Sequence, residues 1–455
     1  MSAQAPAAIQ SEAQRAYTAG AEAWEGGRID LAAAGFGRAA LLLPNWAQAH
    51  ANLGVALRRL GCAEAAVASY TRALVLEPDQ AATLSNLGNA LRDLGRLAEA
   101  ERALSRAVEL EPQSRGYVYN LALLLRDRRR HRESLEILDR LSAAEPGNAE
   151  YRWDCGLSHL YLGDYARGFA GYEARLELAR NPARVFPSPR WTGADPRGLT
   201  LLVASEQGFG DALQFIRFVP LLAGRGAAIV LECLPEQMEL FTGLPGVTAV
   251  FAKGEPPPAH DAWVPLASLP HCLGCTPETL PVEVPYLRVP DRPHLRLIRS
   301  PGTRLAVGLI WAGKTTPRDR SWPLEELMPL LGDPGIAFHS LQLGPRATDL
   351  ARLGVERLVR DPQGLIQSFA DTAALMAQLD LVITIDTAAA HLAGALGRPV
   401  WVLLRYISDW RWRDEPADCP WYPTMRLFRQ PDPDDFKTPV AMVATELSSL
   451  AAKEP

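Results

Sequence analysis

The chain has 455 residues, of which 48% are hydrophobic and 22% are charged, and this composition excludes a wholly disordered or fibrous protein. Its 47 lysines and arginines against 52 aspartates and glutamates give a net charge of −5, which argues against a broad nucleic-acid-binding face. Six cysteines in so long a chain are typical of a reducing compartment. The N-terminus shows no secretory signal, and no apolar run reaches the ~18 residues of a membrane span, so we expect a cytoplasmic protein without one.

A period of 34 residues runs through the N-terminal part of the chain. Prolines stand at positions 44, 78, 112 and 146, and each difference (78−44, 112−78, 146−112) is 34. Repeats of this length are typically pairs of helices, and a proline, which lacks an N–H, ends the second helix of each pair. Small residues such as Gly54 let two helices cross closely, and Tyr70 fills the next layer. The pattern resembles the tetratricopeptide (TPR) repeat, which implies an α-solenoid over residues 1–180.

Three asparagines, Asn52, Asn86 and Asn120, recur with the same period on the first helix of each repeat. A carboxamide offers both a donor and an acceptor, so a row of them can pair with the backbone of an extended peptide. The alternative is that they only form hydrogen bonds between helices. The row resembles the asparagine ladder in the TPR arm of the O-linked N-acetylglucosamine transferases, which implies a groove for a protein partner.

The proline-rich residues 181–198 predict a linker, after which short apolar runs alternate with helical segments. This alternation predicts parallel sheets with helices on both faces, in two halves at residues 199–295 and 303–455 with a cleft between them. Ligands of such sheets bind beyond the carboxyl ends of the strands, so the loops there are the candidate site. The expected strands are Leu199–Ala204, Ala227–Glu232, Val247–Phe251, Ala262–Pro265, Leu305–Trp311, Ala337–Gln342, Glu356–Val359, Leu381–Ile385 and Val400–Leu404.

The first loop holds Gln207, Gly208, Gly210 and Asp211, before a helix expected over Ala212–Leu222. Its glycines let a ligand approach the backbone, and the start of a helix favours an anionic group. Asp211 can act as a general base toward an acceptor hydroxyl. The alternative is that this carboxylate is only a helix cap.

A second loop follows a buried strand that ends at Asp386 and Thr387, and His391 lies one turn into the next helix. The free N–H groups at the start of that helix suit a diphosphate. The alternative for His391 is a helix histidine bonded to a loop carbonyl.

A third loop is rich in basic side chains, which can neutralise a leaving diphosphate without a metal. The alternative is an ordinary surface loop. Three further residues belong to the predicted site. Gln342 ends a strand and can meet a base edge, and Asp371 with Thr372 is expected to cap another helix. The candidates in the third loop are Gly313, Lys314, Arg320 and Ser321.

Five stretches resemble the bacterial heptosyltransferase-like glycosyltransferases: GFGD (208–211), WAGK…DRSWP (311–323), FADTAAL (369–375), DTAAAHLAGALGRPVWVLL (386–404) and DWRW…PWYPTMRLFRQ (409–430). The resemblance implies an α plus α/β chain whose second part is a GT-B enzyme with two Rossmann-like halves. It also implies a C-terminal helix over Pro439–Ala451 that packs back across the first half.

By the same resemblance, Asp211 takes the position of the base and Arg320 falls near that of a phosphate-binding lysine. Thr387 and His391 fall in the turn that binds the diphosphate. Many relatives carry glycine after the Asp-Thr pair, whereas Ala388 and Ala389 follow here, and their methyl groups limit the approach of the phosphates.

These features predict an inverting glycosyltransferase that moves a sugar from a nucleotide-diphosphate sugar to a protein hydroxyl, with no cofactor. The rivals are a non-catalytic TPR scaffold, a transferase acting on a glycan or lipid-linked sugar, and a sugar epimerase on the same fold. The pair Cys272 and Cys275 beside His271 has metal-like spacing, but zinc needs four ligands and no second pair lies near, so no metal site is predicted.

Overall fold

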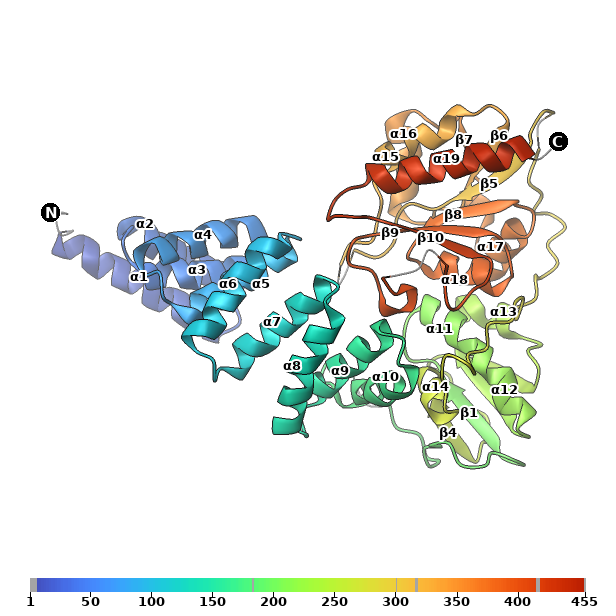
Figure 1. Cartoon of the computed structure of the whole chain (residues 1–455), viewed down its shortest axis with the longest axis horizontal. Coiled ribbons are helices and arrows are strands. Elements are labelled where there is room, and N and C mark those ends of the chain that lie inside the picture. The colour runs from blue at the N-terminus through green and yellow to red at the C-terminus, as the bar shows by residue number, and fades with distance from the viewer. Residues whose placement is uncertain (1–5, 182–183, 300, 316–317, 415–417, 454–455) are drawn as a thin grey trace. The chain divides into compact units, whose positions relative to one another are not determined.

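The computed structural model describes residues 6–181, 184–299, 301–315, 318–414 and 418–453. The chain forms two compact units, divided between Ser158 and His159 (Figure 1). The first unit is all helical, and the second contains two parallel sheets with their helices. In the described ranges, no helix combines the length and the apolar composition that crossing a bilayer requires.

Each 34-residue repeat of the first unit folds as a pair of helices. The second helix of each pair ends two residues before the periodic proline, as α2 does before Pro44 and α4 before Pro78, which confirms the role predicted for these prolines. The helices are α1 (Ala7–Glu25), α2 (Ile29–Leu42), α3 (Ala47–Arg59), α4 (Ala63–Leu76), α5 (Ala81–Asp93), α6 (Leu97–Leu110), α7 (Arg115–Asp127), α8 (His131–Ala144) and α9 (Ala149–Tyr161), the last of which runs into the second unit.

Close helix crossing inside a repeat depends on the predicted pairing of a glycine with a large residue. A Cβ atom on Gly54 would lie 2.6 Å from the ring of Tyr70, and one on Gly88 would lie 2.5 Å from Cγ of Leu104. Both distances are too short for carbon atoms, so these two positions exclude any side chain.

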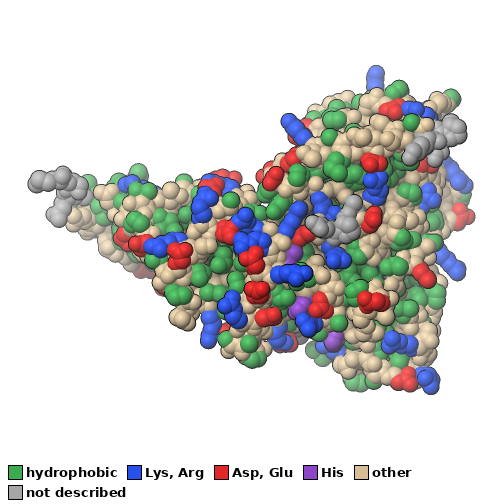
Figure 2. Space-filling model, in the orientation of Figure 1, with side chains coloured by type: hydrophobic (Ala, Val, Ile, Leu, Met, Phe, Trp, Pro, Cys, Tyr) green, Lys and Arg blue, Asp and Glu red, His purple; other side chains and the backbone are tan. Residues whose placement is uncertain are grey.

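Arginine–aspartate pairs join successive repeats across their surface. Arg58 lies 2.7 Å from Asp93, and Arg92 lies 2.6 Å from Asp127. Exposed pairs contribute little to stability, about 1 kcal/mol at most, but the carboxylate of Asp127 is buried and therefore needs its partner. Figure 2 shows blue and red side chains close together on the visible face of these helices.

The second unit contains two sheets in which every neighbouring pair of strands is parallel. The first sheet has the order β3-β2-β1-β4, and the second has the order β10-β9-β8-β5-β6-β7. The strands are β1 (Thr200–Ala204), β2 (Ala228–Cys233), β3 (Val247–Ala252), β4 (Ala262–Pro265), β5 (Leu305–Leu309), β6 (Ile336–Ser340), β7 (Val359–Arg360), β8 (Leu381–Ile385), β9 (Val400–Leu404) and β10 (Met425–Arg429).

The expected strands are all present, with some shifted ends. Strands β5 and β6 end two residues earlier than expected, so Trp311 and Gln342 lie in the loops beyond them, and β7 keeps only two residues. Strand β10 was missed because Met425–Arg429 combines apolar residues with two arginines and forms the edge of the sheet.

Two helix predictions need correction. The helix expected over Ala212–Leu222 begins earlier and is broken by a 3-10 turn into α11 and α12. The C-terminal helix α19 packs on the second half, where Val443 and Leu447 join the core under β5, and not across the first half (Figure 1). The helices of this unit are α10 (Tyr165–Tyr172), α11 (Phe209–Phe215), α12 (Val219–Gly224), α13 (Met238–Phe241), α14 (Leu269–Cys272), α15 (Leu324–Leu327), α16 (Asp349–Leu353), α17 (Phe369–Met376), α18 (Ala388–Ala395) and α19 (Lys437–Lys453).

Helix α10, the last repeat helix, belongs to the second unit and packs on both of its halves. The ring of Phe169 lies 6.4 Å from that of Phe215 in the first half and 5.8 Å from that of Trp410 in the second. Tyr165 lies 5.6 Å from Trp421. Aromatic burial of this kind dominates the energetics of a contact, so α10 helps to hold the two halves together.

We therefore predict that Phe169→Ala lowers the free energy of unfolding of the second unit by about 3–5 kcal/mol, because it empties the centre of this cluster. The matched control is Tyr165→Phe on the same helix. The buried Tyr165 hydroxyl has no hydrogen-bond partner among the described residues, so its removal should cost less than about 1 kcal/mol. Urea titration followed by tryptophan fluorescence measures both values, and equal losses in the two variants would contradict the prediction.

Candidate functional site

A cavity of about 630 Å³ opens between the two halves of the second unit. Its walls are the segments that follow β1, β2, β5, β6, β7, β8 and β9, at the carboxyl ends of the strands, where parallel sheets bind ligands. Most of the residues predicted from the sequence line it. They are Gly208, Gly210 and Asp211 from the first half, and Gly313, Lys314, Arg320, Gln342, Thr372, Asp386, Thr387 and His391 from the second.

Two predicted residues, Ser321 and Asp371, lie behind this lining. The Ser321 hydroxyl accepts a hydrogen bond of 3.2 Å from the Gly313 N–H and so shapes the third loop. The carboxylate of Asp371 accepts from Arg292 at 2.8 Å. Asp371 and Thr372 were expected to cap α17, but the N-cap residue is Ser368. Asp371 and Thr372 lie in the first turn of the helix, where Asp371 and Ser368 form a reciprocal capping box.

The third residue outside the lining, Gln207, exchanges hydrogen bonds of about 3 Å with the hydroxyl of Tyr172 in α10. It lines a separate cavity of about 550 Å³ together with Trp263. The loop that precedes α11, the helix of Asp211, is thus attached to α10 through Gln207.

Both oxygens of the Asp211 carboxylate accept hydrogen bonds. Oδ2 accepts from the Gly208 N–H at 2.9 Å, and Oδ1 accepts from Nη2 of Arg411 at 2.5 Å. The first of these bonds is the helix cap that the sequence left as an alternative. The side chain is nevertheless 27% exposed and lines the cavity, so capping α11 and facing a ligand are compatible.

The two halves approach most closely where α11 meets α18. A Cβ atom on Gly210 would lie 3.0 Å from Cδ2 of His391, so a larger side chain would require the imidazole to shift. This contact brings the N-terminal turns of both helices to the same cavity.

Basic groups gather on the second half's side of the cavity, where Lys314 and Arg320 both line it. Arg320 lies 3.2 Å from the carboxylate of Asp386. Burial raises the pKa of Asp386, and the Arg320 charge opposes that rise.

His391 is held as a neutral imidazole. Burial lowers its pKa well below the ordinary value, and nearby guanidinium groups, that of Arg411 foremost, lower it further. Its Nδ1 lies 2.9 Å from the hydroxyl of Tyr422, and its ring stacks on Trp412 at 5.0 Å. Burial raises the pKa of Tyr422, so that hydroxyl keeps its proton. The hydrogen-bond partner of His391 is therefore this phenol, and not the loop carbonyl that the sequence left as an alternative.

Thr387 is the residue before α18, and its side chain makes no capping bond, so the first turn of the helix faces the cavity uncapped. Ala388 and Ala389, the two departures from the family pattern, both line the cavity. The side-chain amide of Gln342 is hydrogen-bonded to the backbone. Its oxygen accepts from the N–H groups of Trp311 and Ala312 at 3.1 and 2.7 Å. Its contact with a base edge stays a prediction.

Asp409 and Arg411 are among the residues of the cavity that sequence reasoning missed. The neighbouring Trp410 and Trp412, which the sequence leaves open as pocket or core residues, are buried and do not line the cavity, so they are core residues. The D-x-R spacing of Asp409 and Arg411 could have identified them in the sequence. In the structure, Asp409 caps the short turn that carries Arg411.

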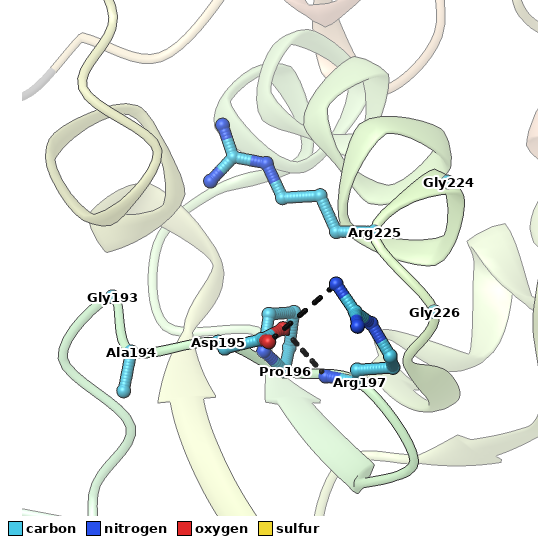
Figure 3. Close-up of a pocket in the computed structure, with 8 residues that line it drawn as sticks. All are labelled: Gly193, Ala194, Asp195, Pro196, Arg197, Gly224, Arg225 and Gly226. Carbon is cyan, nitrogen blue, oxygen red and sulfur yellow. Dashed lines mark hydrogen bonds and ion pairs between the residues drawn. The ribbon is translucent and has the colours of Figure 1, made fainter.

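Another pocket of about 510 Å³ lies at the opposite edge of the first sheet (Figure 3). Arg197 and Gly226 line it, shortly before the first residues of β1 and β2, and Asp195 lies 3.7 Å from Arg197. Ligands of open parallel sheets bind beyond the carboxyl ends of the strands, so this pocket is not the candidate site.

The asparagines of the repeats differ in their contacts. The amide of Asn52 donates to the Tyr17 hydroxyl at 2.7 Å, and that of Asn120 donates to the Ser85 hydroxyl at 3.0 Å. Asn86 is half-buried and makes no side-chain hydrogen bond within the described part of the chain. A carboxamide has two donor hydrogens, so the bonded asparagines keep capacity for a peptide.

No group of three or more metal-ligating side chains occurs among the residues that the structure describes. Cys272 donates weakly to the Trp191 carbonyl, and burial raises the pKa of its thiol to about 11, so it is held as a packed thiol.

Comparison with known proteins matches both parts of the chain. Residues 63–115, 85–149 and 119–183 match the tetratricopeptide repeat model, and residues 367–435 match glycosyltransferase family 9 (heptosyltransferase). Protein FlbA of Caulobacter vibrioides is 29% identical over 328 residues, which cover 64% of this chain and 54% of FlbA. The chain therefore spans about half the length of that curated relative.

Among solved structures, MamA from Desulfovibrio magneticus is 19% identical with a TM-score of 0.35, and the match covers 38% of this chain and 97% of that one. A thermophilic TPR protein in Thermus thermophilus is 21% identical with a TM-score of 0.32, over 37% and 92%. The repeat matches fall on the helical pairs, and the glycosyltransferase match falls in the part that contains the second parallel sheet. The chain thus contains tetratricopeptide repeats and a region similar to glycosyltransferase family 9 (heptosyltransferase).

Proposed function

We propose that this protein is an inverting glycosyltransferase that moves a sugar from a nucleotide-diphosphate sugar to a serine or threonine hydroxyl of a protein recruited by the repeats. The observation that carries the proposal is that Asp211 of the first half and Arg320, Thr387 and His391 of the second line one cavity. Sugar transfer needs a base on the acceptor side and positive charge on the leaving-group side, and this cavity has both.

The donor binds to the second half. The charges of Lys314 and Arg320 and the uncapped N-terminal turn of α18 at Thr387 suit a diphosphate, so we propose that no metal or cofactor is needed. The methyl groups of Ala388 and Ala389 keep the phosphates slightly further from the backbone than glycine would.

The reaction is one displacement. The Asp211 carboxylate takes the proton of the acceptor hydroxyl, and the hydroxyl oxygen forms a bond to the anomeric carbon. The bond from that carbon to the diphosphate oxygen breaks, and its electron pair leaves with the diphosphate, whose charge Lys314 and Arg320 stabilise. Attack from the side opposite the leaving group inverts the configuration.

One rival keeps support from the structure, namely a scaffold that binds the donor without turnover. Both Asp211 oxygens already accept hydrogen bonds, and Ala388 narrows the approach of the phosphates. A carboxylate oxygen has a second lone pair for a hydroxyl proton, which is why we favour catalysis.

The donor site is tested by thermal unfolding with nucleoside diphosphates and nucleotide sugars. We expect one nucleotide to stabilise the wild-type protein by about 2.7 kcal/mol at a hundredfold excess over Kd, and Arg320→Ala to lose that shift because it removes a phosphate-binding charge. Arg304→Ala is the matched control, since its exposed pair with Asp333 lies outside the cavity. The absence of a shift with every nucleotide would refute the donor site.

The base is tested by Asp211→Asn, which keeps the size of the side chain but cannot take a proton. We expect kcat to fall about 100- to 10,000-fold while the Kd of the nucleotide stays the same. Release of nucleoside diphosphate measures kcat, and calorimetry measures Kd. An unchanged kcat would show that Asp211 is only a cap, and donor binding without any wild-type turnover would favour the scaffold.

The acceptor is tested on the repeats. Asn86→Ala should raise KM about threefold to tenfold for an unfolded, serine- and threonine-rich polypeptide such as casein, because one backbone hydrogen bond is lost. Transfer to maltose, which has no peptide backbone, should not change. Asn45→Ala, an exposed turn residue of the same unit, serves as control. Equal rates on both acceptors in all variants would favour the glycan or lipid-linked acceptor.

A further inference from the structure

We propose that Arg411 is a positioning residue that reaches from the second half to orient the Asp211 carboxylate of the first. This inference rests on the function proposed above, because it assumes that Asp211 is the base. It adds a residue outside the predicted site and a physical link between the second half and the alignment of the base.

The Arg411 guanidinium uses all three of its nitrogens on fixed partners. Nη2 donates to Asp211 Oδ1 at 2.5 Å, Nη1 donates to Asp409 Oδ1 at 2.9 Å, and Nε donates to Oε1 of Gln214. Asp211 and Gln214 both belong to α11 of the first half, whereas Asp409 precedes Arg411 in the second half. The guanidinium therefore bonds to α11 at two points and to its own loop at a third.

Asp211 is fixed in its plane by two donors on different elements. Arg411 holds one oxygen and the Gly208 N–H holds the other, so rotation about the last side-chain bond would break at least one of the two hydrogen bonds. A base held in one orientation is worth much more than a mobile one, because a misplacement of 1 Å can cost about 100-fold in rate.

Arg411 is itself immobile. It is 7% exposed, and its guanidinium lies 4.6 Å from the ring centre of Trp410 and 5.5 Å from that of Phe215. Helix α10 packs behind both rings through Phe169. The last repeat helix thereby supports the platform on which the arginine lies.

Lysine cannot reproduce this arrangement. A planar guanidinium directs separate N–H groups to three acceptors, whereas an ammonium is a point charge at the end of a flexible stem. Arg411→Lys keeps the positive charge beside Asp211 and Asp409 but loses the fixed geometry. It therefore separates orientation of the base from neutralisation of charge.

The experiment measures release of nucleoside diphosphate by the full-length protein from UDP-glucose, UDP-N-acetylglucosamine, GDP-mannose and ADP-heptose, with water as acceptor. For a donor that the wild type turns over, Arg411→Lys should lower kcat about 10- to 100-fold and leave KM for the donor unchanged. Arg426→Gln is the matched control, since Arg426 pairs with Glu446 at 3.0 Å outside the cavity, and it should keep the wild-type kcat.

A second variant guards against a folding defect. Arg411→Ala leaves space for guanidinium ion, and adding that ion should raise kcat, whereas urea at the same concentration should not. A structural defect would not respond to the added ion. Thermal unfolding of each variant confirms that the second unit is folded.

The outcomes separate this inference from the proposed function. Loss of kcat in Asp211→Asn together with full kcat in Arg411→Lys overturns the role of Arg411 and leaves the base in place. A rise of donor KM in Arg411→Lys with kcat unchanged would make Arg411 a donor-binding residue and also overturn it. Wild-type protein that turns over none of these donors, or an unaffected Asp211→Asn, overturns the proposed function and this inference with it.

Discussion

Two buried arginines impose the constraint on which the second unit depends. Arg217, in the first half, donates to the Trp421 carbonyl of the second at 2.7 Å, and Arg411, in the second, donates to Asp211 and Gln214 of the first. A buried guanidinium is tolerated only when its N–H groups find partners, so each arginine requires the opposite half to be in place. The cavity between the halves is a consequence of that mutual requirement.

The boundary between repeats and transferase is a shared layer of packing. By sequence period, α10 is the second helix of a repeat, but its aromatic side chains pack on Phe215, Trp410 and Trp421 of the second unit. Tyr172 also bonds to Gln207, in the loop that precedes the helix of Asp211. The last repeat helix therefore supports both halves of the second unit.

Much of the cavity was predictable because its residues follow the carboxyl ends of strands, as Asp211 does in the first sheet and Arg320 and Thr387 do in the second. The prediction failed where a side chain acts far from its own strand. Arg411 reaches α11 with its guanidinium over the ring of Trp410, and a tryptophan-rich stretch can line a ligand pocket or belong to the core. The cap of α17 was misplaced by a few residues because Ser368 and Asp371 share a reciprocal motif.

The sequence by itself determined the repeat period, the alternation of strand and helix and the motifs of the glycosyltransferase family, because these depend on residues close in the chain. Only the tertiary structure decided which groups meet. Asp211 and Arg411 are 200 residues apart, and their hydrogen bond exists because two sheets bury their facing helices against each other. Likewise, the neutral state of His391 follows from burial beside Tyr422 and the guanidinium groups, which no local pattern encodes.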